Sequence, residues 1–125
     1  MDPRHKLRIK IIENLYAYSY NNTKMSLPHP KEKKTIDVIK HIDALDKFIT
    51  TFAPKYPVDK IAKTDLAILR LSIYELMIER HEPEKVIINE AVELAQEFSG
   101  KKSSGFINAV LGQIFKNSEE HKSYV

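Results

Sequence analysis

The sequence predicts an all-helical protein. Glycine occurs only three times in 125 residues, and runs of β-branched residues bounded by turns are few, so little in the chain favours strands. Apolar residues instead recur at spacings of three and four along almost the whole chain, which is the period of a helix with one buried face. We therefore predict one helical domain over residues 1–118, with a disordered tail at 119–125.

The first predicted helix runs from Arg4 to Tyr20. Its apolar face consists of residues spaced by three and four, namely Leu7, Ile11, Leu15 and Tyr18. The opening stretch PRHKLRIKII also contains four fixed cations, Arg4, Lys6, Arg8 and Lys10. The helix dipole favours acidic residues at this end, so these cations need another explanation.

The middle of the chain predicts a loop and a second helix. The segment NNTKMSLPHPKEKK contains Asn, Ser and two prolines and is predicted to be a long, exposed, basic loop. The second predicted helix covers residues 35–52 and ends at APKYP. Its predicted buried stripe consists of Ile36, Ile39, Ile42, Leu45, Phe48, Ile49 and Phe52.

Three further helices are predicted in the second half. The third begins near Thr64 or Asp65, either of which is a candidate N-cap, and ends before Pro83. The fourth runs from Ile87 to Phe98 and is ended by Gly100. The fifth lies in SSGFINAVLGQIFKN, and the following SEEHKSYV has no hydrophobic period. The predicted inward residues of these helices are Leu66, Leu69, Ile73, Leu76 and Met77, then Ile88, Ala91, Val92, Ala95 and Phe98, then Phe106, Val110 and Ile114.

The residue inventory argues against catalysis, metal binding and a cofactor. The chain has no cysteine, which excludes disulfides, thiolate zinc sites and cysteine nucleophiles. It also lacks a Gly-rich phosphate loop, an HExxH motif and a GxSxG turn. Asp37 and His41 share a helix face, but two ligands do not complete a metal site. No apolar run approaches the ~20 residues of a membrane span, so we expect a cytoplasmic binding protein.

Charge is concentrated at the N-terminus. The first ten residues have four cations against Asp2, a surplus of three that equals the net charge of +3 for the whole chain. This cluster of positive charge indicates contact with a polyanion, although a solvated basic terminus is the alternative. On a helical wheel Arg4 and Arg8 fall in or beside the apolar arc. We therefore expect the first two turns to project past the bundle, with both arginines beside a phosphate-binding groove.

Polar groups also interrupt two apolar helices. Arg70 and Glu75 lie within LAILRLSIYEL, and Asn89 and Glu90 lie within IINEAVELA. We expect these groups to satisfy one another or the helix ends inside the bundle through charge-assisted hydrogen bonds.

Four strings, in this order, resemble the NusB family of bacterial transcription antitermination factors: PRHKLRIKIIENLY, ILRLSIYEL, VIINEAVELAQEF and SSGFINAVL. The resemblance implies an all-helical fold of two small packed bundles. It implies a non-enzymatic protein that binds boxA-type single-stranded RNA together with the ribosomal protein NusE in the transcription elongation complex, supporting processive transcription of ribosomal RNA operons. The resemblance implies that Arg4, His5, Lys6 and Arg8 form the RNA-binding basic cluster and that Asp65 contacts the protein partner. We expect four residues in and just after the loop before the fifth predicted helix to complete the RNA site: Lys101, Lys102, Ser103 and Phe106.

The chain departs from the family pattern in two places. The N-terminal bundle is expected to be shortened, and Gly105, Ala109 and Gly112 replace the residues common in the family's matching motif. A scaffold of the same fold with weakened or lost RNA binding is therefore the alternative function. A homodimer is a further possibility, because an aromatic RNA-binding face can also self-associate.

Overall fold

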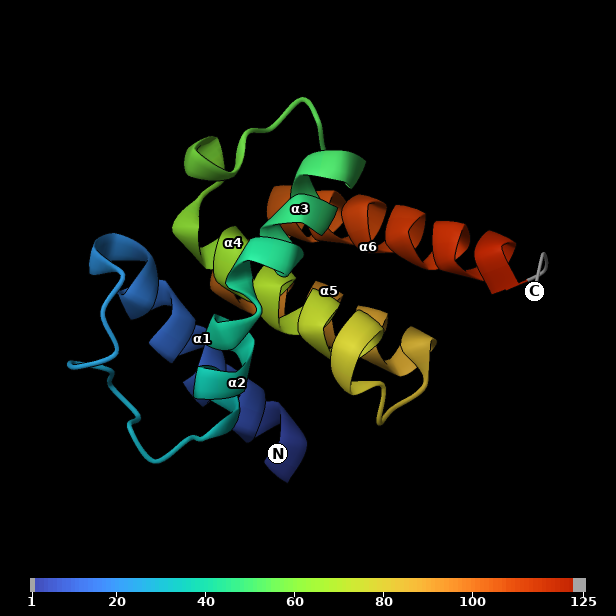
Figure 1. Ribbon diagram of the computed structural model, residues 1–125. Coiled ribbons are helices and arrows are strands. Elements are labelled where there is room, and N and C mark those ends of the chain that lie inside the picture. The colour runs from blue at the N-terminus through green and yellow to red at the C-terminus, as the bar shows by residue number, and fades with distance from the viewer. Residues whose placement is uncertain (1, 123–125) are drawn as a thin grey trace.

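The computed structural model describes residues 2–122, and within them it contains helices and no strand (Figure 1). The α-helices are α1 (Pro3–Asn21), α2 (Lys34–Lys40), α3 (Ile42–Phe52), α4 (Lys63–Ile73), α5 (Glu84–Phe98) and α6 (Lys101–Lys122). A 3₁₀ turn, η1 (Val58–Lys60), precedes α4, and a π-helical segment, η2 (Tyr74–Glu79), follows it. The predicted all-helical class is confirmed. None of these helices is both long enough and apolar enough to span a bilayer.

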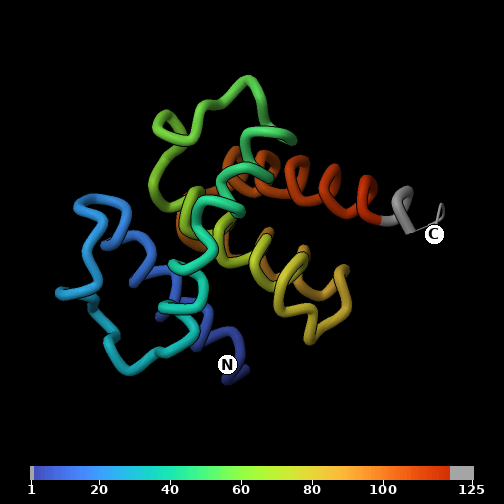
Figure 2. Tube along the Cα trace, viewed as in Figure 1, coloured from blue at the N-terminus to red at the C-terminus, as the bar shows by residue number. Residues whose placement is uncertain are grey.

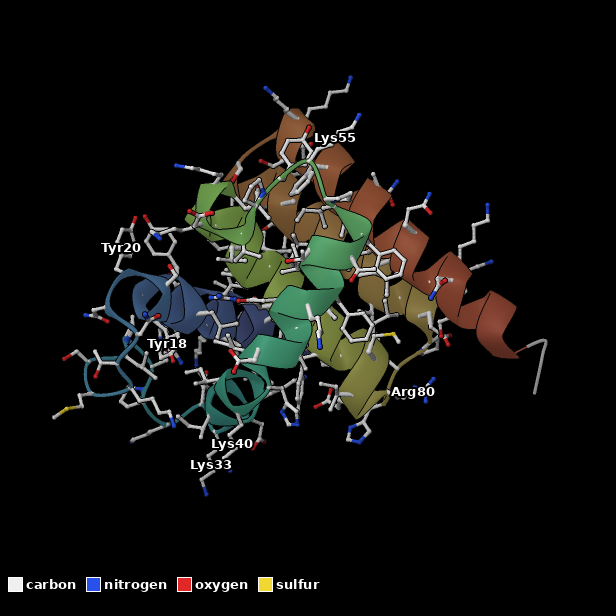
Figure 3. The ribbon with its side chains drawn as sticks, turned by 45° about the horizontal axis from the view of Figure 1, so that its top comes forward. Tyr18, Tyr20, Lys33, Lys40, Lys55 and Arg80 are labelled. Atoms are coloured by element: carbon white, nitrogen blue, oxygen red, sulfur yellow. The ribbon has the colours of Figure 1, made fainter. Side chains whose placement is uncertain are left out.

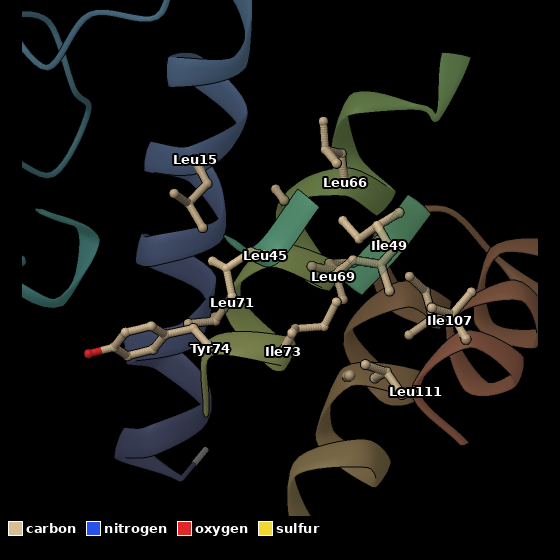
Figure 4. Packing of buried hydrophobic residues seen from close by; sticks show 14 of the residues in the cluster. Leu15, Leu45, Ile49, Leu66, Leu69, Leu71, Ile73, Tyr74, Ile107 and Leu111 are labelled. Carbon is tan, nitrogen blue, oxygen red and sulfur yellow. The ribbon is translucent and has the colours of Figure 1, made fainter. Parts of the chain in front are cut away.

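Helix α4 is the centre of the fold. It contacts α1, α3, α5 and α6, and every residue from Asp65 to Ile73 is buried. This explains why its sequence is apolar almost all round instead of along one stripe. Figure 4 shows side chains of three other helices converging on it, among them Leu15, Ile49 and Leu111.

The predicted second helix is two helices that meet at His41. The His41 backbone has φ −106° and ψ 9°, and its N–H donates to the carbonyl of Val38 at 3.0 Å. Its side-chain Nδ1 donates to the carbonyl of Asp37 at 2.8 Å, which gives that carbonyl a side-chain partner in place of an ordinary helical one. The prediction of one continuous helix over 35–52 was therefore wrong, because neither Pro nor Gly marks the break.

Helix ends differ from the predictions in several places. Neither Thr64 nor Asp65 caps α4; its N-cap is Ala62, with no side-chain hydrogen bond. Helix α5 begins three residues before its predicted start, and Phe98, predicted to point inward, is 41% exposed. Helix α6 continues to Lys122, which is four residues into the predicted tail, and residues 123–125 lie outside the described part of the chain.

The basic loop predicted at 21–34 is observed at residues 22–33, where the chain runs away from the helices before returning to α2 (Figure 2). The part of the loop that leads to α2 is held by Asn14 of α1, which is completely buried. The Asn14 amide donates to the His29 carbonyl and to Thr35 Oγ1, each at 2.8 Å, and accepts from the His29 N–H at 2.8 Å. Asn14 is therefore the buried attachment of the loop to α1, and Glu13 adds an exposed contact to His29 at 2.8 Å.

We expect Asn14→Ala to lower the free energy of unfolding by about 2–4 kcal/mol, because it leaves buried partners without hydrogen bonds. Urea denaturation monitored by circular dichroism measures this change. Asn108→Ala, at an exposed position of α6, is the matched control and should change stability by less than about 0.5 kcal/mol. Equal stability of the two variants would show that Asn14 does not anchor the loop.

Candidate functional site

The first three turns of α1 place their cations on two sides of the helix. Arg4, Lys6 and Lys10 are exposed, whereas His5 and Arg8 are buried. Arg4 Nη1 donates to Glu82 at 3.0 Å, yet its side chain remains 68% exposed. We refer to Arg4, Lys6 and Lys10 as the basic arm.

Arg8 does not stand beside an open groove, so that expectation from the helical wheel was wrong. Only 6% of Arg8 is exposed. Its guanidinium makes a two-pronged hydrogen bond to Glu75, with Nε to Oε2 at 3.0 Å and Nη2 to Oε1 at 2.7 Å. Burial alone lowers the pKa of Arg8, but the hydrogen bond to Glu75 and the nearby charges raise it above its ordinary value. Arg8 is therefore a permanent buried cation.

The Arg8–Glu75 pair is the centre of a larger ionic cluster. Arg8 also contacts Glu82, and its Nη1 lies 3.6 Å from Glu90. Lys34 of α2 lies 2.8 Å from Glu79 and 3.6 Å from Glu75. Glu75 and Glu90, two of the polar residues that interrupt apolar helices, thus pair inside the bundle as expected. Arg70 instead pairs with Asp46, through two hydrogen bonds of 2.9 and 3.0 Å.

His5 links the start of α1 to α5. Its Nδ1 lies 2.6 Å from Glu90 and its Nε2 lies 3.0 Å from Glu97. Both ring nitrogens can donate only when the imidazole is protonated. The hydrogen bond to Glu90 raises the pKa of His5 above its ordinary value, burial opposes this rise, and Glu97 adds to it.

The start of α6 forms the second part of the site. Lys101 and Lys102 are exposed, and Ser103 and Phe106 are partly buried. The Ser103 hydroxyl donates to Oδ2 of Asp65 at 3.2 Å. The Phe106 ring packs edge-to-face against Tyr56, with 5.1 Å between the ring centroids. A pocket of about 330 Å³ lies here, and its lining consists of Tyr56, Lys60, Ile61, Ala62, Asp65, Lys102, Ser103 and Phe106.

Asp65 lies in this pocket and not on an open surface. Only 8% of the residue is exposed. Burial raises the pKa of the Asp65 carboxyl above its ordinary value, and the hydrogen bond from Ser103 partly opposes this rise. The expectation that Asp65 offers a surface charge to a protein partner therefore receives no support from its position.

The His5–Glu97 contact connects the two parts of the site. Glu97 lies in the last turn of α5, and the chain enters α6 only four residues later, at Lys101. Through His5, the first turn of α1 is thereby attached to the end of α5 that leads into α6. Of the eight expected RNA-binding residues, the structure leaves Arg4, Lys6, Lys101 and Lys102 exposed, while it buries His5 and Arg8.

The segment between α3 and α4 also lies at the site, although the sequence prediction did not include it. Tyr56 and Lys60 line the pocket with Phe106, and Lys55 lies at the end of the molecule where α6 begins (Figure 3). The signal was available in APKYPVDKIAK, where lysines alternate with an aromatic residue and prolines. The prediction used APKYP only as a helix terminator and VDKIAK only as the approach to the third helix.

The NusB family model matches residues 6–116. A transcription antitermination protein NusB of Oceanobacillus iheyensis is 36% identical, in a match that covers 89% of this chain and 97% of that protein. Its counterpart in Dehalococcoides mccartyi is 48% identical over 63% of this chain and 55% of that protein. In that second match the chain spans about half the length of its relative.

A solved structure gives the same fold. A chain from a crystal structure of antitermination factors NusB and NusE in complex with double-stranded RNA superposes with a TM-score of 0.77. The match covers 91% of this chain and 96% of that chain at 19% identity. The structural similarity thus spans nearly all of both chains, and at this low identity it establishes the fold alone.

We expect Arg8→Ala to lower the free energy of unfolding by about 3–5 kcal/mol, because it leaves Glu75 buried without its main counter-ion. Arg4→Ala removes two ion pairs, to Asp2 and Glu82, of an arginine that is largely exposed, and it should cost less than about 1 kcal/mol. Chemical denaturation of the two variants beside the wild type measures both effects. A mild effect of Arg8→Ala would contradict the structural role assigned to this arginine.

His5 should make stability fall as the pH rises. Its folded-state pKa lies above the unfolded value of 6.5, so the folded protein binds the proton more tightly. The stabilisation is fully present below about pH 6.5 and is lost as the pH rises through the folded-state pKa. Melting temperatures measured from pH 5 to 9 should therefore decline less steeply for His5→Gln than for the wild type. Parallel curves would exclude this linkage.

Proposed function

The chain belongs to the NusB family, and from this premise we propose that it is a transcription antitermination factor that binds boxA-type single-stranded RNA together with ribosomal protein NusE. In this proposal it acts in the cytoplasm within the transcription elongation complex and supports processive transcription of ribosomal RNA operons. The family's members are not enzymes, in agreement with the prediction from the residue inventory. The solved complex of NusB and NusE with double-stranded RNA supports NusE and an RNA as the partners.

The single observation that supports RNA binding most directly is the set of exposed cations at the two parts of the site. Lys6, Lys101 and Lys102 form no ion pair with any described residue, and Arg4 forms only exposed or half-exposed ones. Cations in this state are available to phosphates, and Arg4 can offer two parallel N–H donors to one phosphate.

We assign different roles to the eight residues. Arg4, Lys6, Lys101 and Lys102 hold phosphates, Ser103 adds a hydrogen bond, and Phe106 contacts a base. His5 and Arg8 do not touch RNA in this proposal. They hold the first two turns of α1 against Glu90 and Glu75, so that the basic arm is presented in one fixed orientation.

A protein partner has a more suitable surface than Asp65. A second pocket, of about 360 Å³, is lined mainly by apolar groups, including Ile12, Tyr16, Pro28 and Phe98. Tyr16 is 40% exposed and Phe98 is 41% exposed, which is typical of aromatic anchors at protein interfaces. We place the NusE contact here. This surface also suits the alternative function, a scaffold without RNA binding.

A double variant of the arm tests the proposed function. We expect Arg4→Ala with Lys6→Ala to weaken binding of a boxA-type single-stranded RNA, because each lost phosphate contact removes about 0.7 from the slope of log affinity against log salt. Fluorescence anisotropy at several salt concentrations, with and without NusE, measures both quantities. The melting temperature should hardly change, because both residues are exposed.

The matched control is Lys33→Ala with Lys40→Ala, which removes two cations from the region of α2. Figure 3 shows Lys33 and Lys40 at the end of the molecule opposite Lys55. This control should keep the wild-type salt slope. If the wild type binds NusE but no RNA at low salt, the scaffold function replaces the proposed one.

A further inference from the structure

The pocket at the start of α6 combines three kinds of surface. Tyr56 and Phe106 form an aromatic wall, and their rings meet edge-to-face. Lys60 and Lys102 are exposed and lie at its rim. Asp65, which is 92% buried, lines it from the first turn of α4. The volume of about 330 Å³ is within the range of pockets that hold small planar ligands.

Asp65, which lines this pocket, has a buried carboxylate oxygen without a partner. Its Oδ2 accepts from Ser103, but its buried Oδ1 is the one buried side-chain oxygen or nitrogen among the described residues that lacks a hydrogen-bond partner. Such groups are rare in folded proteins and call for a specific explanation. Rotation of an aspartate about its last torsion is soft, so either carboxylate oxygen can face the pocket. Since Asp65 does not cap α4, its Oδ1 can accept from an N–H donor in the pocket once this torsion turns it in that direction.

The charges around the pocket select among ligands. A free phosphate or sulfate would approach the lysines but meet the Asp65 carboxylate. A lysine or arginine side chain of a protein partner would suit Asp65 but would have to pass Lys60 and Lys102. A nucleotide within a strand satisfies both, because its base is neutral with N–H donors along one edge and its flanking phosphates are anionic.

We propose that this pocket binds one unpaired base of the RNA, and that Asp65 selects guanine by accepting hydrogen bonds from its N1–H and its exocyclic amino group. Tyr56 and Phe106 contact the face or edge of the base, and Lys60 and Lys102 hold the adjacent phosphates. Two neighbouring N–H donors match the two oxygens of one carboxylate, whereas uracil offers one donor and adenine only its amino group. The inference rests on the proposed function and makes Asp65 a specificity-determining residue.

The test compares short oligouridylates that have one central guanine, inosine, adenine or uracil. The wild type should bind the guanine strand about tenfold more tightly than the all-uracil strand. Inosine keeps the N1–H but lacks the amino group, so its strand should bind with intermediate affinity. Asp65→Asn should remove the preference for guanine while leaving the salt slope unchanged, because the phosphate contacts remain.

Asp59→Asn is the matched control, since Asp59 is an exposed aspartate of the neighbouring η1 turn, and it should keep the wild-type preference. Melting by circular dichroism establishes that each variant is folded. The comparison of guanine with inosine uses only the wild type, so the inference remains testable even if Asp65→Asn does not fold.

The outcomes separate the two proposals. Binding that depends steeply on salt but ignores the central base overturns the pocket inference and leaves the proposed function in place. Absence of binding to every strand, and also to the boxA-type RNA in the presence of NusE, overturns both. Retention of the guanine preference by Asp65→Asn, together with weaker binding of NusE, overturns the inference and makes Asp65 a protein contact.

Discussion

The buried ion pair between Arg8 and Glu75 is the constraint on which the arrangement of this protein depends. Removing a guanidinium and a carboxylate from water is costly, and only close geometry with further hydrogen bonds recovers that cost. Here the recovery comes from a two-pronged hydrogen bond and from Glu82, Glu90 and Lys34 around it. These groups belong to α1, α2, η2, the turn before α5, and α5 itself. A shift of any of these segments would leave a charge without its partner.

The same cluster divides the cations of α1 into two functional sets. His5 and Arg8 face the carboxylates of the bundle, while Arg4, Lys6 and Lys10 face solvent. Because successive residues are about 100° apart on a helix, one short basic stretch supplies both sets. The inner set fixes the orientation of the helix, and the outer set takes its positions from that orientation. An excess of positive charge at a helix start, unfavourable by the dipole alone, is accommodated because acidic residues from elsewhere in the chain surround it.

Much of the fold could be predicted from the sequence, since the helical period is a local property. The positions of α1, α5 and α6 follow from it within a few residues. The break at His41 could not, because it depends on a side-chain hydrogen bond to Asp37. Arg8 within the apolar arc and Glu75 within an apolar helix are both charged residues at positions where the pattern favours apolar ones, but they are 67 residues apart. The helical period is local and does not show that these two residues pair, so the ionic cluster could not be predicted from it.

Two buried carboxylates show how structural and functional roles differ in this chain. Glu75 is 2% exposed and each of its oxygens has a cationic partner, so its burial is compensated within the molecule. Asp65 is also buried, yet one of its oxygens lacks a partner, and Lys60 and Lys102 line the same pocket without forming an ion pair with it. An uncompensated acceptor lowers stability, and one beside a pocket lined by lysines and aromatic rings is suited to a ligand with N–H donors and negative charge. Stability accounts for Glu75, while the proposed base contact accounts for the position of Asp65.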